Sequence, residues 1–86
     1  MPTSYILINS DLGTDESIIT KLKEILEGEK NTHYEIQGVY GVYDIVLILS
    51  SDDIDSLRST ITNKIRKITS VQSTLTMMVI EEQGKS

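Results

Sequence analysis

The chain has 86 residues and a net charge of −5, from eight basic and thirteen acidic side chains, and it contains no cysteine and one histidine. Its length predicts one domain, and the lack of cysteine excludes disulfides and a zinc site. The basic residues cluster only at Lys64, Arg66 and Lys67, where a helix end is expected, so the composition argues against direct nucleic acid binding.

The first half of the chain predicts a strand, a helix and a second strand. Residues 4–9 are apolar on both sides of an extended chain. A helix follows, with Thr14 as its expected N-cap and Gly28 as its expected end. Its apolar side chains recur at helical spacing, at Ile18, Ile19, Leu22, Ile25 and Leu26. Residues 33–39 then alternate in the manner of a half-buried strand.

The second half predicts another strand, a second helix and a last strand. Residues 43–50 contain an unbroken run of five apolar residues. Ser51 or Asp52 is the expected N-cap of the second helix. The apolar stripe of that helix consists of Ile54, Leu57, Ile61, Ile65 and Ile68. Residues 71–80 are rich in β-branched side chains, which is typical of a strand.

The order β-α-β-β-α-β predicts an α+β fold, a ferredoxin-like sandwich whose first and third strands are central. Both central strands are apolar on both faces, whereas two helices cover only one face of the sheet. At about 25 cal/mol per Å², leaving the other face in water would cost several kcal/mol, out of a stability of about 5–15 kcal/mol. We therefore expect a homodimer with its sheets packed face to face, a dimeric α+β barrel.

The segment from Gly38 to Asp44, G-V-Y-G-V-Y-D, lies between the second and third strands. It differs from the dinucleotide-binding fingerprint, and no helix N-terminus follows it that would hold a phosphate. We interpret it as a hairpin turn in which Gly41 adopts a positive φ and Asp44 binds the loop backbone. Such a turn is also able to line a ligand site.

Other polar groups give weaker indications of a metal, catalytic or ligand site. The three aspartates within residues 52–55 lack the glycine and glutamate of a calcium loop, and helix capping explains them better. His33 has no second metal ligand or catalytic partner at a suitable spacing. We therefore expect no metal, no cofactor and no catalytic residue. Thr74 and Thr76 share one side of the last strand, where their hydroxyls either bind a polar ligand or reflect the strand preference of threonine.

Three longer segments match one known pattern. They are the hairpin Y-G-V-Y-D-I-V (residues 40–46), the segment K-I-R-K-I-T-S-V-Q-S-T-L-T-M-M-V-I (residues 64–80) and the segment L-G-T-D-E-S-I-I-T-K-L-K-E-I (residues 12–25). The hairpin resembles the G-x-Y-D turn of the Lrp/AsnC family, the leucine-responsive and asparagine-synthesis regulators. The other two segments are similar to the end of that family's second helix with its last strand, and to its first helix.

The matching part is the effector-binding half of that family, the RAM domain. The resemblance implies one such domain over residues 1–81, followed by a polar tail, residues 82–86. Because Met1 leads directly into the first strand, we expect a stand-alone form without the helix-turn-helix domain of typical members. The resemblance also implies face-to-face dimers, an octameric ring of four dimers in many members, and an amino acid effector bound between neighbouring dimers.

The predicted ligand-binding residues come from the hairpin and the last strand. They are Tyr40, Gly41, Val42, Tyr43, Asp44, Ser73, Thr74 and Thr76. By resemblance, Asp44 would pair with the ammonium group of an amino acid, and the threonine hydroxyls would add hydrogen bonds. The chain departs from the family pattern at Tyr40, where many members have threonine or serine, and at residues 69–70, where Thr-Ser replaces Pro-Gly.

We therefore expect a non-enzymatic, cytoplasmic domain that binds an amino acid, oligomerises, and modulates regulators of the Lrp/AsnC family, by forming mixed assemblies with full-length members. No apolar run is long enough to span a membrane. Two alternatives stay open. One is a small dimeric barrel enzyme of the monooxygenase or isomerase type, with a polar cavity beneath its helices. The other is a purely structural assembly module.

Overall fold

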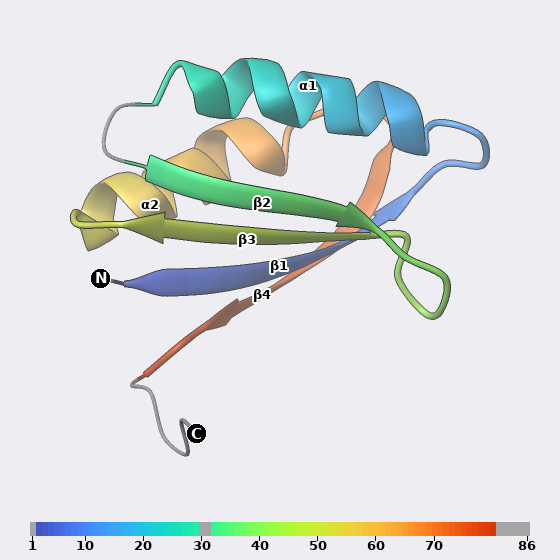
Figure 1. Ribbon diagram of the computed structural model, residues 1–86. Coiled ribbons are helices and arrows are strands. Elements are labelled where there is room, and N and C mark those ends of the chain that lie inside the picture. The colour runs from blue at the N-terminus through green and yellow to red at the C-terminus, as the bar shows by residue number, and fades with distance from the viewer. Residues whose placement is uncertain (1, 30–31, 81–86) are drawn as a thin grey trace.

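The computed structural model describes residues 2–29 and 32–80, with the backbone alone for Ile54 and Thr62. The elements are β1 (Thr3–Ser10), α1 (Asp15–Glu27), β2 (Thr32–Gly38), β3 (Ile45–Ser51), α2 (Ile54–Thr60), the π-helix η1 (Ile61–Ile65) and β4 (Val71–Met78) (Figure 1). This order confirms the predicted ferredoxin-like α+β fold. None of the described helices is long and apolar enough to cross a membrane. The predicted tail, residues 82–86, lies outside the described residues.

The strands form one antiparallel sheet in the order β2-β3-β1-β4. β1 and β3 are central, as their two-sided apolar character predicts. Ile6 lies opposite Leu47, and Ile8 lies opposite Ile45, so alternate residues of both strands point to the same face. α1 and the second helix, formed by α2 and η1, lie together over that face (Figure 1).

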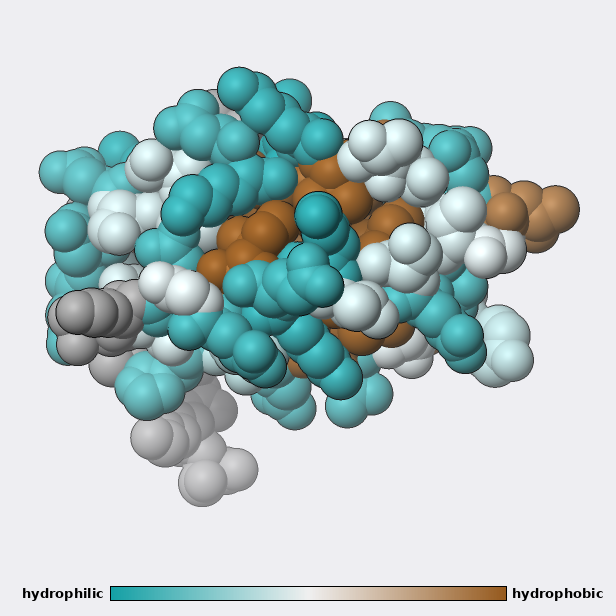
Figure 2. Space-filling view, turned by 90° about the horizontal axis from the view of Figure 1, so that it is seen from above, coloured by the Kyte–Doolittle hydropathy of each residue, from teal (hydrophilic) through white to brown (hydrophobic). Residues whose placement is uncertain are grey.

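The core between the helices and the sheet is almost entirely aliphatic. It consists of Ile6, Ile8, Ile18, Leu22, Leu26, Ile45, Leu47, Leu49, Leu57, Ile61, Ile65 and Ile68. The buried polar side chains among the described residues are the hydroxyls of Ser4, Ser51 and Thr60, and each has a hydrogen-bond partner. Seen from the helix side, hydrophilic side chains cover most of the surface, while apolar side chains show between them and also protrude at one end (Figure 2).

The opposite face of the sheet, here called the open face, has no cover among the described elements (Figure 1). It carries two adjacent rows of apolar side chains across β3, β1 and β4, made of Ile48, Tyr5 and Met77, and of Val46, Leu7 and Leu75. Tyr5, Leu75 and Met77 are 39%, 45% and 47% exposed. The expected uncovered apolar face is therefore present.

The second helix differs from the continuous α-helix that its apolar stripe predicts. After Thr60 it widens into a π turn, in which the amide of Arg66 donates to the carbonyl of Ile61 at 3.2 Å. The buried residues Leu57, Ile61 and Ile65 are four residues apart. In an α-helix each step of four residues advances by about 40° around the axis. The wider turn reduces this drift and keeps all three side chains on the sheet.

The N-cap of α2 is Asp53 rather than the expected Ser51 or Asp52. Its Oδ1 accepts hydrogen bonds from the amides of Asp55 at 3.0 Å and Ser56 at 3.2 Å. The backbone of Asp53 is extended, with φ −110° and ψ 105°, which is the conformation of an N-cap residue. Ser51 lies two residues before this N-cap, and its Oγ accepts a hydrogen bond from the amide of Asp53 at 3.2 Å.

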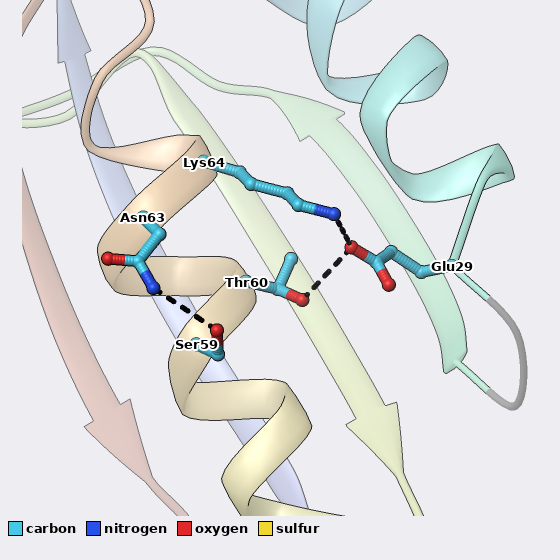
Figure 3. Close-up of polar contacts among 5 residues, drawn as sticks. All are labelled: Glu29, Ser59, Thr60, Asn63 and Lys64. Atoms are coloured by element: carbon cyan, nitrogen blue, oxygen red, sulfur yellow. Dashed lines mark hydrogen bonds and ion pairs between the residues drawn. The ribbon is translucent and has the colours of Figure 1, made fainter.

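A polar clamp joins the end of α1 to the second helix (Figure 3). Glu29 Oε1 accepts a hydrogen bond from Thr60 Oγ1 at 3.3 Å and forms an ion pair with Lys64. The Glu29 side chain is only 17% exposed, so water screens this pair less than an ordinary surface pair. Asn63 donates to Ser59 one turn earlier, at 3.1 Å. The clamp therefore helps to hold the two helices side by side on the sheet.

The turn before β4 contains a strained residue. Ser70 has a φ of 80°, the one positive φ of a non-glycine residue in the described part of the chain. Its carbonyl accepts a hydrogen bond from the amide of Asp11 at 2.8 Å. The left-handed conformation costs a residue with a side chain roughly 1–2 kcal/mol, so serine at this position stores backbone strain.

Replacing Ser70 by glycine should therefore stabilise the domain. The relief of strain exceeds the larger unfolded-state entropy of glycine by about 0.5–1 kcal/mol, which raises Tm by roughly 2–8 °C for a domain of this size. Circular dichroism melts measure the shift. The matched control is Thr69→Gly, at a neighbouring position where φ is not positive, and it should lower Tm. An unchanged or lowered Tm for Ser70→Gly would contradict the assignment of strain.

Candidate functional site

A cavity of about 600 Å³ lies at one end of the sheet. The loop between β1 and α1 and the hairpin between β2 and β3 both project from this end (Figure 1), and β4 begins there. The lining residues are Ser10, Asp11, Leu12, Gly13, Asp15, Gly38, Val39, Tyr40, Asp44 and Gln72. The volume is that of a small-molecule site. We call this space the hairpin cavity.

Asp44 fastens the hairpin to the end of β1. Its Oδ2 accepts hydrogen bonds from the amide of Ser10 at 2.9 Å and from Ser10 Oγ at 3.2 Å. Its own amide donates to the carbonyl of Ile8 at 3.0 Å, and its carbonyl accepts from the amide of Val39 at 2.8 Å. The carboxylate thus binds backbone as expected, but the backbone belongs to the neighbouring strand rather than to the loop.

Asp11 fastens the β1–α1 loop to the start of β4. Its amide donates to the carbonyl of Ser70, and its Oδ1 accepts from Gln72 Nε2 at 3.0 Å. Its carbonyl accepts from the amide of Thr14 at 3.1 Å and from the Thr14 hydroxyl at 2.6 Å. Gly13, the third residue of this turn, has a φ of 78°, as a type II turn requires. Thr14 precedes α1 as predicted, but its hydroxyl serves this turn and makes no cap bond.

The hairpin tip depends on glycine and is lined with exposed apolar side chains. Gly41 has a φ of 152°, which confirms the predicted positive φ. A Cβ at this position would meet nothing within 4 Å, so the requirement is conformational rather than steric. Tyr40 and Val42 are 107% and 84% exposed, and Leu12 on the adjacent loop is 102% exposed. Exposed apolar residues gathered at one end of a molecule indicate an interaction surface.

The lining of the hairpin cavity is acidic. The carboxylates of Asp11, Asp15 and Asp44 belong to it, and no lysine, arginine or histidine does. Among the described residues, no group of three or more side chains is arranged to hold a metal ion. The cavity therefore favours a ligand with a positive charge, such as an ammonium group, which carboxylates bind through charge-assisted hydrogen bonds.

The predicted hairpin residues lie together, although they do not all line the cavity. Tyr40 and Asp44 belong to its wall. Gly41, Val42 and Tyr43 form the rest of the turn that positions Asp44. The prediction that these five residues bind a ligand remains a prediction.

The predicted residues of β4 lie elsewhere. Ser73 is on the open face, where its hydroxyl accepts a hydrogen bond from Asn9 Nδ2 at 3.3 Å. Thr74 and Thr76 are on the helix side of β4 and line a second cavity. Within one chain, the structure thus separates the hairpin residues from the threonines with which the resemblance groups them.

Sequence reasoning missed part of the cavity wall, namely Ser10, Asp11, Gly13, Asp15 and Gln72. The pattern of residues 11–15 by itself indicates only a turn and a helix start. The predicted strand order, however, contained the information needed to place these residues beside the hairpin. In an antiparallel sheet with β1 between β3 and β4, the end of β1 must meet the starts of both neighbours. The loop after β1 therefore lies beside the hairpin.

Comparison with known proteins gives one family and several similar folds. The Lrp/AsnC ligand binding domain family matches residues 5–85. The crystal structure of FFRP-DM1 is 31% identical with a TM-score of 0.75, and the match covers 93% of this chain and 100% of that one. E. coli AsnC is 28% identical with a TM-score of 0.73, over 94% of this chain and 52% of AsnC.

A third structure shares the fold alone. It is the complex of the transcriptional regulator NMB0573 from Neisseria meningitidis with L-Met, which is 12% identical with a TM-score of 0.69, over 94% of this chain and 51% of that one. No curated protein matches the chain. Because the family match extends over almost all of the described elements, from β1 to the end of β4, the chain belongs to the Lrp/AsnC ligand-binding domain family.

Proposed function

We propose that this domain binds an amino acid in the hairpin cavity, assembles into homo-oligomers and modulates transcription regulators of its family without catalysing a reaction. The acidic lining of the cavity carries this proposal. Three carboxylates and no basic side chain surround a space of about 600 Å³. A space with this charge attracts an ammonium group, and its size suits a small metabolite.

The two charged groups of an amino acid each have a complement in the cavity. Asp44 Oδ2 is occupied by its two hydrogen bonds from Ser10, and no bond from a described residue reaches Oδ1, so this atom is free to accept from the ammonium group. In the turn after β1, the amides of Leu12 and Gly13 donate to no described carbonyl. In this proposal, they donate to the α-carboxylate.

The open face supports the proposed homodimer. Two rows of apolar side chains from three strands lie there side by side, and covering them with a second copy removes apolar area from water. We further propose that the exposed side chains of Leu12, Tyr40 and Val42 join neighbouring dimers, up to a ring of four. Such contacts would close the hairpin cavity from outside and place the ligand between dimers.

The core disfavours the barrel enzyme. The buried side chains of the described residues are aliphatic apart from three hydroxyls, and they include no histidine and no carboxylate. His33 is exposed on β2 beside Glu35 rather than beneath the helices. A general acid or base would thus have no enclosed polar space in which to act.

In this proposal, the ligand changes assembly because it binds one oligomeric state more tightly than another. Mixed assemblies with full-length family members, in the cytoplasm, would carry that change to transcription. The alternative of a purely structural module differs in one respect, since it assembles without any ligand.

A thermal-shift screen of the common amino acids tests ligand binding. A ligand at about a hundred times its Kd stabilises the folded state by about 2.7 kcal/mol, which raises Tm by ten degrees or more in a domain of this size. The variant Asp44→Asn should weaken that ligand by about tenfold or more, because it removes the charge that pairs with the ammonium group. Its amide oxygen still accepts from Ser10, so the hairpin is retained.

Asp52→Asn is the matched control, because it removes the same charge from an exposed residue outside the cavity. It should bind like the wild type. If no amino acid raises Tm, or if Asp44→Asn binds as tightly as the control, the proposed ligand site is wrong. Retained oligomers without any ligand response would instead favour the structural module.

Light scattering tests the homodimer at micromolar concentration. The wild type should have at least the mass of two chains, and Leu75→Asp should have the mass of one, because it places a carboxylate at the β4 end of an apolar row. Ser17→Asp adds the same charge on the exposed side of α1 and should leave the mass unchanged. A monomeric wild type would refute the face-to-face dimer.

A further inference from the structure

A second cavity, of about 300 Å³, lies between the second helix and the edge strand β4. We call it the helix-edge cavity. It is lined by Arg58, Ile61, Arg66, Thr74, Leu75, Thr76 and Met78. None of these residues belongs to the wall of the hairpin cavity. The two spaces are therefore built from different parts of the chain.

The charge of the helix-edge cavity comes from two arginines. Arg58 lies in α2 and Arg66 follows η1, and the π turn between them sets their relative positions. Neither guanidinium forms a hydrogen bond or an ion pair with a described residue. No carboxylate lines the cavity. In a chain with a net charge of −5, two arginines without acidic partners beside one cavity form a local site for an anion.

The uncharged part of the lining narrows the class of anion. The hydroxyls of Thr74 and Thr76 can donate to a carboxylate oxygen. The half-buried side chain of Met78 supplies an apolar wall, whereas Ile61, which is 4% exposed, belongs to the core and adds little surface. An inorganic ion leaves such a wall in contact with water, whereas an organic anion covers it and gains the free energy of apolar burial.

We propose that the helix-edge cavity binds a small organic carboxylate with an apolar body and no ammonium group. Arg58 and Arg66 hold the carboxylate, since a planar guanidinium pairs with two carboxylate oxygens at once. The threonine hydroxyls complete its hydrogen bonds, and the hydrocarbon body lies against Met78. The hairpin cavity, with its three aspartates, selects the opposite charge. The two cavities thus distinguish an amino acid from the corresponding simple acid.

Three probes with one carbon skeleton test this proposal by isothermal titration calorimetry. They are 4-methylpentanoate, its neutral amide 4-methylpentanamide, and leucine, which adds an α-ammonium group to the acid. The acid should bind with a Kd on the order of 1 mM, as expected for a ligand of this size. Arg58→Gln and Arg66→Gln should each weaken it by about tenfold or more. Arg58→Lys should restore binding only in part, because lysine keeps the charge without the planar fork.

Two control variants show whether a loss of binding comes from the arginines of this cavity or from a general change in charge. Lys23→Gln removes the same charge from an exposed position of α1 outside both cavities, and Asp44→Asn alters the hairpin cavity alone. Both should bind 4-methylpentanoate like the wild type, and circular dichroism melts confirm that each variant is folded. The proposal is overturned if the acid does not bind, if the amide binds equally well, or if a folded arginine variant binds the acid as tightly as Lys23→Gln.

Discussion

Two helices cover one face of a four-stranded sheet, while the central strands of that sheet are apolar on both faces. This mismatch determines most of the architecture. On the covered face, alternate residues of β1 and β3 meet the stripes of α1 and the second helix in an aliphatic core. On the open face, the remaining alternate residues lie in two uncovered rows. The fold therefore has one side with a packed core and one side whose apolar rows lie uncovered by the described elements.

The same sheet positions the loops that form the hairpin cavity. β1 ends where β3 and β4 begin, so three connections converge at one end. Two aspartates fasten them across long sequence separations, Asp44 to Ser10 and Asp11 to Gln72. Since these bonds form within the chain, the cavity is shaped without a ligand, and a preformed space of this kind would lower the entropic cost of binding. The carboxylates that hold the loops also give the cavity its charge.

The two cavities carry opposite charges, which the net charge of the chain does not reveal. The hairpin cavity has three carboxylates and no basic residue, whereas the helix-edge cavity has two arginines and no acidic residue. The division follows the elements: the acidic groups lie on loops at the end of the sheet and at the start of α1, and the arginines lie in α2 and directly after η1. A π turn between Arg58 and Arg66 brings both of them to the same cavity while the buried isoleucines stay on the sheet.

The sequence by itself determined the order of the elements, the two-sided central strands, the buried stripes and the positive φ of Gly41. Each of these features depends only on residues that lie close together in the sequence. It did not determine the N-cap Asp53, the π turn, or the partner of Asp44, which lies 34 residues away in the chain. The resemblance groups Thr74 with the hairpin, and within one chain the pleat of β4 directs this residue to the helix side, away from the hairpin cavity. Which loops meet, and which side chains share a cavity, is decided by strand order and register. These arise from contacts between distant residues, which local periodicity does not encode.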